Sequence, residues 1–269
     1  MAESTRPQRT AGSGFSPFWL LLILITGTYL FFILALLGAT ATYAEPNDLW
    51  SAIKKKEIQY SIKLSLITCT LTALLSLLIA VPAGYLLART KFPGKSFVES
   101  ALDIPIVLPP MVIGLCLLIF FQTPLGHVID SVVEFTYQVY GVVLAQLVIG
   151  AAFAIRTMRG TFEHLSSRPE EVAMTLGCSR GKAVWLVTLP AAWRGMLAAM
   201  SVAWARSLGE FGPILVFAGA TRMRTEVLPT TVWLEISVGN LEASVAVSLL
   251  MVFFAMIVLV AVRWIGERI

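Results

Sequence analysis

Long apolar stretches alternate with short polar segments along the whole chain. Six stretches approach or exceed the length of about 20 mostly apolar residues that a bilayer span needs. None has the alternating pattern of a strand, and a backbone in lipid has to satisfy its own hydrogen bonds. We therefore predict an all-α integral membrane protein with six transmembrane helices. The predicted spans are Pro17–Leu37, Leu64–Ala88, Ile104–Phe121, Val139–Ile155, Gly195–Ala220 and Ala243–Val262.

Composition supports this fold class. The chain is 57% hydrophobic and only 13% charged, whereas a soluble domain carries about 25% charged residues. The first span follows Arg6 and Arg9, as a signal peptide would, but it is longer than the usual signal core of about 7–15 residues. We predict that it is a retained helix, that residues 1–16 are a disordered cytoplasmic tail, and that residues 17–269 form one transmembrane domain.

The distribution of Lys and Arg predicts the orientation in the membrane. With the N-terminus in the cytoplasm, 13 of these residues lie inside and six lie outside, with Arg206 left within a span. The positive-inside rule favours this arrangement, although Lys54–Lys56 on the outer side are a local exception. We expect a multi-pass protein of the inner (cytoplasmic) membrane with both termini in the cytoplasm. Segment Gly150–Arg194 would then face the cytoplasm.

Several kinds of chemistry are not indicated. The three cysteines and two histidines have no metal-type spacing, so we expect no metal site and no catalytic residues. No GxxxxGK[ST] loop is present, so ATP and its Mg²⁺ would be bound by another chain. No basic block indicates a nucleic-acid partner. A secondary transporter is an alternative, but it would need several buried carboxylates or paired broken helices, and only Glu210 lies plainly within a span.

The polar segment between the fourth and fifth spans predicts two short helices joined by a bend. Pro169 suits a first helical turn, and Glu170 and Glu171 complement the positive end of the helix dipole. Gly177 can end this first helix. The stripe of apolar or small residues on it consists of Val172, Ala173 and Leu176.

The second short helix is predicted to begin near Ser179. Leu189 and Pro190 are predicted to end it before the fifth span. Two interpretations of the whole segment are open at this point. It is either an amphipathic helix pair lying in the membrane interface or a rigid helix that docks into a groove of a cytoplasmic partner.

Segment 163–190 resembles the EAA loop in the membrane subunits, or permeases, of ABC importers. The pattern of that loop is Glu-Ala-Ala, then Gly, then nine residues before Ile-x-Leu-Pro. This chain has Glu171-Val172-Ala173, then Gly177, then Val187-Thr188-Leu189-Pro190 after the same gap of nine. Val for the middle Ala and Val for Ile are mild departures. The resemblance extends over about residues 58–262.

The resemblance implies a type I ABC importer permease that pairs with a second copy of itself and sits on two ATPase subunits. Its short helix would insert into a groove of the ATPase, so that closure of the ATPases on ATP moves the membrane helices. The residues implied in ATPase coupling are Glu170, Glu171, Ala173, Gly177, Leu189 and Pro190.

The fifth span carries an intramembrane charge. Arg206 lies roughly 18 Å from the cytoplasmic edge, near the middle of a ~30 Å core. Glu210 follows four residues later, on the same face of a helix, and Gly209 and Gly212 would loosen that helix. Two interpretations are open: a structural ion pair, or a cation that lines a pathway and eases the passage of an anion.

The string Ser207–Gly212, Ser-Leu-Gly-Glu-Phe-Gly, resembles the oxyanion branch of the permease family. The similarity is to molybdate and tungstate permeases, with sulfate or thiosulfate permeases as the alternative. It implies that a separate external binding protein captures the ion. Lys54–Lys56, Arg222 and Arg224 are candidate contacts for that protein; alternatively, they are solvated loop charges or contacts for lipid headgroups. The residues implied in the translocation path or gate are Arg206, Ser207, Gly209, Glu210 and Gly212.

Prolines and a glycine in two other spans predict local geometry. Pro105, Pro109 and Pro110 would kink the third span or delay its start, or form a re-entrant turn near the path. Gly84 in the second span would allow close packing of two helices.

Overall fold

The computed structural model describes residues 17–43 and 46–268, and these residues form helices and no strand. The chain divides into two compact units, Met1–Ala44 and Glu45–Ile269. In the first unit the described part is one helix, α1 (Pro17–Tyr43), which buries none of its residues. The predicted tail, residues 1–16, lies outside the described residues.

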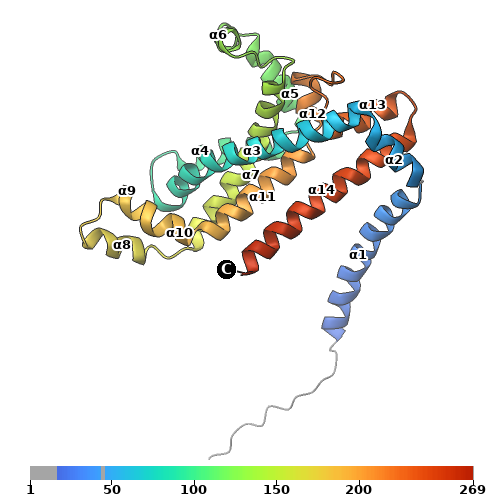
Figure 1. Ribbon diagram of the computed structural model, residues 1–269. Helices are drawn as coiled ribbons and strands as arrows, with labels where there is room; N and C mark the ends of the chain where they lie inside the picture. The colour runs from blue at the N-terminus through green and yellow to red at the C-terminus, as the bar shows by residue number, and fades with distance from the viewer. Residues whose placement is uncertain (1–16, 44–45, 269) are drawn as a thin grey trace, which may run out of the picture. The chain divides into compact units, whose positions relative to one another are not determined.

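The second unit holds the remaining helices (Figure 1). In chain order they are α2 (Pro46–Lys54), α3 (Lys56–Arg89), α4 (Lys95–Val107), α5 (Pro110–Phe121), α6 (Pro124–Val132), α7 (Val139–His164), α8 (Arg168–Thr175), α9 (Arg180–Ala183), the π-helix η1 (Val184–Thr188), α10 (Leu189–Ala191), α11 (Trp193–Leu208), α12 (Gly212–Phe217), α13 (Leu228–Ser237) and α14 (Leu241–Arg268).

The predicted six-span architecture is confirmed, with two of the spans bent. Among the described residues, α1, α3, α7 and most of α14 are uninterrupted helices long and apolar enough to cross a membrane. Two bent pairs bring the number to six. The helix axis bends by 111° between α4 and α5, and by 72° between Arg180–Ala191 and α11. The first bend follows Leu108, which is extended because a proline comes next.

Two predicted helix boundaries are wrong. The fifth predicted span, Gly195–Ala220, is not one helix, because α11 ends at Leu208 and α12 begins only at Gly212. Leu189 and Pro190 do not end the helix before this span, which continues to Ala191. The reason is the wide π-turn of η1, in which the Leu189 amide donates to the Val184 carbonyl. Pro190 follows this turn and remains helical although proline has no N–H. The bend follows at Ala192.

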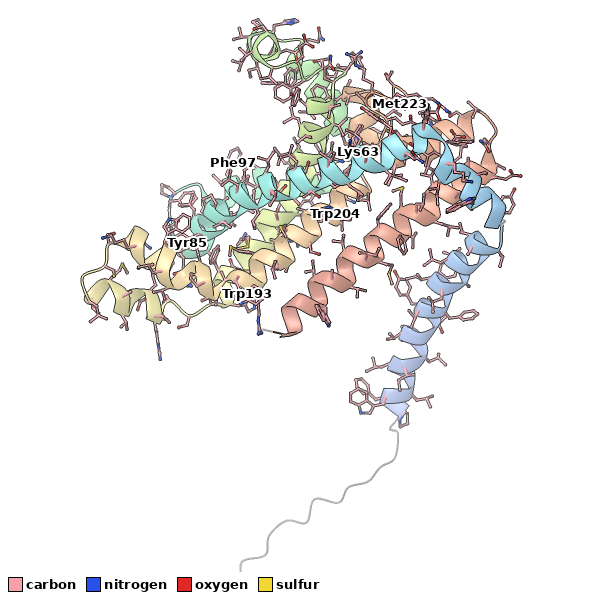
Figure 2. All side chains as sticks on the ribbon, viewed as in Figure 1. Lys63, Tyr85, Phe97, Trp193, Trp204 and Met223 are labelled. Atoms are coloured by element: carbon pink, nitrogen blue, oxygen red, sulfur yellow. The ribbon has the colours of Figure 1, made fainter. Side chains whose placement is uncertain are left out.

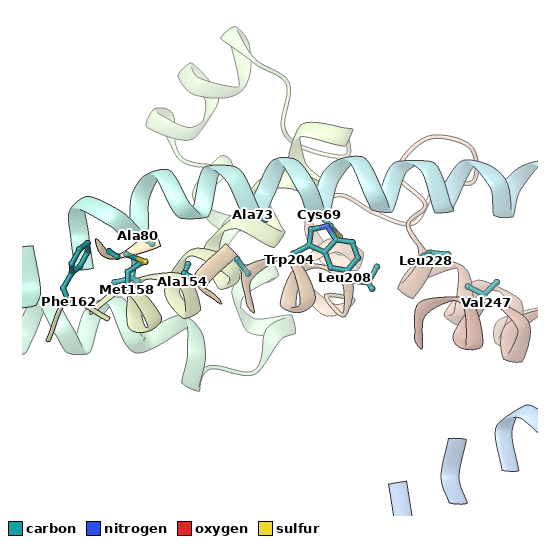
Figure 3. Packing of buried hydrophobic residues seen from close by; sticks show 14 of the residues in the cluster. Cys69, Ala73, Ala80, Ala154, Met158, Phe162, Trp204, Leu208, Leu228 and Val247 are labelled. Atoms are coloured by element: carbon teal, nitrogen blue, oxygen red, sulfur yellow. The ribbon is translucent and has the colours of Figure 1, made fainter. Parts of the chain in front are cut away.

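Helices α3, α7 and α11 pack together as the core of the second unit (Figure 3). Small residues let the helices approach closely. A Cβ added to Gly84 of α3 would lie 2.8 Å from the Cβ of Met158 on α7, so the predicted packing role of Gly84 is confirmed. The labelled side chains along this core include Cys69, Ala73, Ala80, Ala154, Met158, Trp204 and Leu208.

Helix α12 packs against α5 through two glycines in reciprocal positions. A Cβ on Gly114 of α5 would lie 2.8 Å from the Cα of Pro213, and a Cβ on Gly212 would lie 2.9 Å from the backbone nitrogen of Met111. The third span therefore brings its second half against the start of α12.

The two ends of the α3–α7–α11 core differ in what they carry. Figure 2 shows Tyr85 and Trp193 toward the end that leads into α8 and α9, and Met223 toward the opposite end. At that opposite end, Arg222 pairs with Glu235 of α13 at 2.9 Å. Burial raises the pKa of the nearby Glu226 carboxyl, and the Thr231 hydroxyl and the Arg222 guanidinium offset part of that rise.

Candidate functional site

The segment Arg168–Ala191, which we call the elbow, projects from one end of the core (Figure 1). Helix α8 ends in a Schellman motif, in which the Gly177 amide donates to the Met174 carbonyl at 3.0 Å and the Cys178 amide donates to the Ala173 carbonyl at 3.1 Å. Gly177 has φ +93°, a left-handed conformation that favours glycine. The predicted bend at Gly177 is confirmed.

Glu170 fixes α8 to the membrane helices. Its side chain is buried, and its Oε1 accepts a hydrogen bond from the hydroxyl of Tyr85 on α3. Its Oε2 accepts one from the hydroxyl of Thr188 in η1 at 2.9 Å. The Arg180 Nε lies 3.9 Å from Oε1. One carboxylate therefore joins α8, α9, η1 and α3.

The amphipathic pattern of α8 is the reverse of that expected for a helix packed on an apolar core. It buries a carboxylate and leaves its apolar side chains exposed: Val172 is 56% exposed and Leu176 is 81% exposed. These two residues are four positions apart and so share one helix face. An apolar face of this kind on a short, rigid helix is typical of a surface that another molecule covers.

Apart from the buried Glu170, the predicted coupling residues fall into two groups. Glu171 and Gly177 are exposed on α8 and its cap, and Ala173 is half-buried beside them. Leu189 and Pro190 lie instead at the root of the elbow, where they border an apolar groove along α3 of about 1040 Å³. Sequence reasoning missed Tyr85 and Thr188. Nothing local marks Tyr85, which lies 85 residues from its partner, whereas Thr188 stands inside the motif itself.

The second site is the turn Gly209–Phe211 between α11 and α12, which we call the α11 break. Arg206 Nη2 contacts Glu210 Oε1, so the predicted ion pair is confirmed, although it spans the end of the helix and not a continuous helical face. The Arg206 side chain is 39% exposed, whereas that of Glu210 is 2% exposed. The guanidinium lies 5.1 Å from the centroid of the Phe153 ring on α7, a cation–π distance.

The other predicted path residues lie around this pair. Ser207 is fully buried and donates its hydroxyl to the Ala203 carbonyl at 2.8 Å. Gly209 is exposed, with ordinary backbone angles and room for a side chain. Gly212 is buried at the crossing with α5. Arg206 thus lies beside both tightly packed residues, Ser207 and Gly212, and an open position, Gly209.

Replacing Gly212 by alanine is expected to destabilise the protein, because the new Cβ would meet the backbone nitrogen of Met111 at 2.9 Å. Overpacking of this kind typically costs about 1–3 kcal/mol. Thermal unfolding in detergent measures the effect. Gly209→Ala is the matched control, since the nearest atoms to its Cβ would lie at 3.8 and 3.9 Å. Equal unfolding midpoints for the two variants would contradict the assigned crossing.

Together, an all-helical membrane unit, an intramembrane charge and a projecting elbow define a membrane permease. The fold is shared with a bacterial ABC transporter involved in the import of the acidic polysaccharide alginate. That crystal structure superposes with a TM-score of 0.73 at 15% identity, covering 95% of this chain and 97% of the other. Residues 80–269 match the family described as binding-protein-dependent transport system inner membrane component. The chain belongs to that family.

Curated relatives extend the similarity over nearly the whole chain. A molybdate/tungstate transport system permease protein of Thermococcus kodakarensis is 34% identical over 246 residues, which are 90% of this chain and 94% of that protein. A molybdenum transport system permease protein of Mycobacterium tuberculosis is 32% identical over 249 residues, 91% of this chain and 93% of the relative. The family resemblance found in the EAA loop is confirmed.

Proposed function

We propose that the chain is the transmembrane subunit of an ATP-driven importer that carries a tetrahedral oxyanion, molybdate or tungstate, into the cell. The names of the relatives support these ions over sulfate or thiosulfate. ATP and Mg²⁺ bind to a partner ATPase, and this chain is a non-catalytic subunit.

The observation that carries the proposal is that α8 exposes its apolar side chains and buries a carboxylate. Val172 and Leu176 are exposed, while Glu170 is held inside by hydrogen bonds. An apolar anchor on a bent, capped helix suits insertion into a groove of a cytoplasmic ATPase. With two copies of the chain, two such elbows engage two ATPase subunits.

The α11 break is the proposed point of control over the ion. Arg206 offers a half-exposed positive charge near the middle of the membrane, where a charge is costly and is retained for a task. An anion passing this point would be attracted to the guanidinium, while Glu210 prevents it from binding too tightly. ATP-driven closure of the partner subunits would move the elbows and open the path outward.

In this proposal, the end of the core opposite the elbow meets the external binding protein. The candidate contacts are Arg222 and Arg224 on the loop before α13 and Lys54–Lys56 at the junction of α2 and α3. The elbow and both termini lie on the cytoplasmic side of the inner membrane, which the excess of Lys and Arg at the elbow end supports.

Reconstitution tests the proposal. The chain is co-expressed with the ATPase and the binding protein that accompany it, placed in proteoliposomes, and supplied with ATP inside and molybdate, tungstate or sulfate outside. We expect ATP-dependent uptake of molybdate or tungstate. Uptake of sulfate alone would transfer the chain to the alternative substrate. Uptake that follows an ion gradient without ATP would identify a secondary transporter.

A further inference from the structure

A buried amide lies beside the α11 break. Gln146 of α7 is 1% exposed and faces both other core helices. Its Nε2 donates to the Ser207 carbonyl at 3.1 Å and lies 3.7 Å from Cys69 Sγ, and its Oε1 accepts a hydrogen bond from the Thr72 hydroxyl at 3.2 Å. The side chain therefore joins α3, α7 and α11 at one point.

The contact with Ser207 has a particular position in the fold. Because α11 ends at Leu208, the carbonyl of Ser207 is among the last four of the helix, which lack the full helical set of partners. The Glu210 amide reaches this carbonyl at 3.3 Å, and the Gln146 amide supplies a second donor at 3.1 Å. Gln146 thus stabilises the last turn of α11, just before the α11 break.

Helix α7 also contacts Arg206, the charged residue before the α11 break. Phe153 is seven residues after Gln146, two turns along one face of α7, and its ring lies under the Arg206 guanidinium. Helix α7 therefore contacts the break twice, once at the backbone of Ser207 and once at the side chain of Arg206. Movement of either contact would change how Arg206 meets Glu210.

We propose that Gln146 is a positioning residue that fixes the end of α11 and thereby the orientation of the Arg206–Glu210 pair. This inference rests on the proposed function, because only an importer whose ion passes Arg206 gives the orientation a transport role. An amide buried in a membrane helix without such a bond would be strongly unfavourable.

The neighbouring Ser76 provides a matched control. It lies one turn after Thr72 on α3, and its buried hydroxyl has no hydrogen-bond partner among the described residues. Ser76→Ala removes a buried polar atom without breaking a hydrogen bond. Gln146→Met keeps the approximate length of the side chain and removes both the donor and the acceptor.

Hydrogen exchange followed by mass spectrometry tests the positioning directly, on the assembled transporter in nanodiscs. In Gln146→Met we expect exchange of the backbone amides in residues 207–212 to rise about tenfold, as the loss of a buried hydrogen bond predicts. Exchange of the amides in α3 and α7 should stay unchanged. Exchange in Ser76→Ala should match that of the wild type throughout. Unchanged exchange at 207–212, or a rise spread over the whole core, would overturn the inference.

Uptake then links the position to transport. We expect Gln146→Met to reduce molybdate uptake about tenfold alone and to add nothing in an Arg206→Gln background, because residues acting through one group are non-additive. Independent, additive losses would overturn the inference. Faster exchange at 207–212 with normal uptake in both single variants would leave the positioning intact and would overturn the path role given to Arg206 in the proposed function.

Discussion

Gly177→Val is expected to abolish molybdate uptake while leaving the membrane unit folded. Gly177 has φ +93°, which a β-branched residue adopts only at a cost of about 1–3 kcal/mol. The Schellman hydrogen bonds of the Gly177 and Cys178 amides would be lost with that conformation. Apart from its two chain neighbours, no described residue has an atom within 4 Å of a Cβ built on Gly177, so the bundle itself would not be disturbed. Helix α8 would then present its apolar face in the wrong direction.

The measurement is ATP-dependent uptake in proteoliposomes together with co-purification of the ATPase. Gly181→Val is the matched control, because Gly181 also has open space around it but lacks a positive φ. Gly177→Asn should retain most of the uptake, since asparagine tolerates the left-handed region. Normal uptake and normal ATPase association in Gly177→Val would contradict the assignment of the elbow as the coupling element.

Arg206→Gln is expected to reduce uptake by at least about tenfold, because it removes the half-exposed positive charge and leaves the buried Glu210 carboxylate without its cation. Breaking a fully buried pair costs about 3–5 kcal/mol, and the exposure of Arg206 makes the cost smaller here. The exchange of charges, Arg206→Glu with Glu210→Arg, separates two causes of that loss. It restores the pair and should recover part of the stability. It should not recover uptake, because the positive charge moves from a side chain that is 39% exposed to one that is 2% exposed.

Thermal unfolding and uptake of the same preparations are compared. Arg159→Gln is the comparison variant: Arg159 pairs with Glu163, four residues on and 44% exposed, and with Glu99 of α4, 20% exposed. Both carboxylates are more exposed than Glu210, so we expect the loss of their cation to cost less. If the exchanged pair restored uptake along with stability, Arg206 would be a structural residue and would have no role in the path.

The local features of this fold could be predicted from the sequence because they depend on near neighbours. Apolar runs gave the six spans, and Gly177 gave the bend of the elbow because only its own backbone angles are involved. Gly209 and Gly212 predict that the helix loosens after Arg206. They do not predict the extent of the break, since α12 starts where Gly212 meets Met111 of a distant helix.

The features that sequence reasoning missed depend on residues far apart in the chain. Glu170 was assigned to the coupling surface from its motif, yet its partner Tyr85 turns it inward. No local pattern marks Gln146, because its partner Ser207 is 61 residues away. Pro190 signalled a helix end because local rules do not anticipate a π-turn just before it.

The buried carboxylate of Glu170 also has a mechanical consequence. Because it grips α3 and η1 directly, a displacement of α8 reaches the bundle through short polar bonds and not along a flexible loop. If an ATPase moves α8 as proposed, these hydrogen bonds would make α3 and η1 move with it. We expect the number of ions carried per ATP hydrolysed to fall when the hydrogen bonds of Glu170 to Tyr85 and Thr188 are removed.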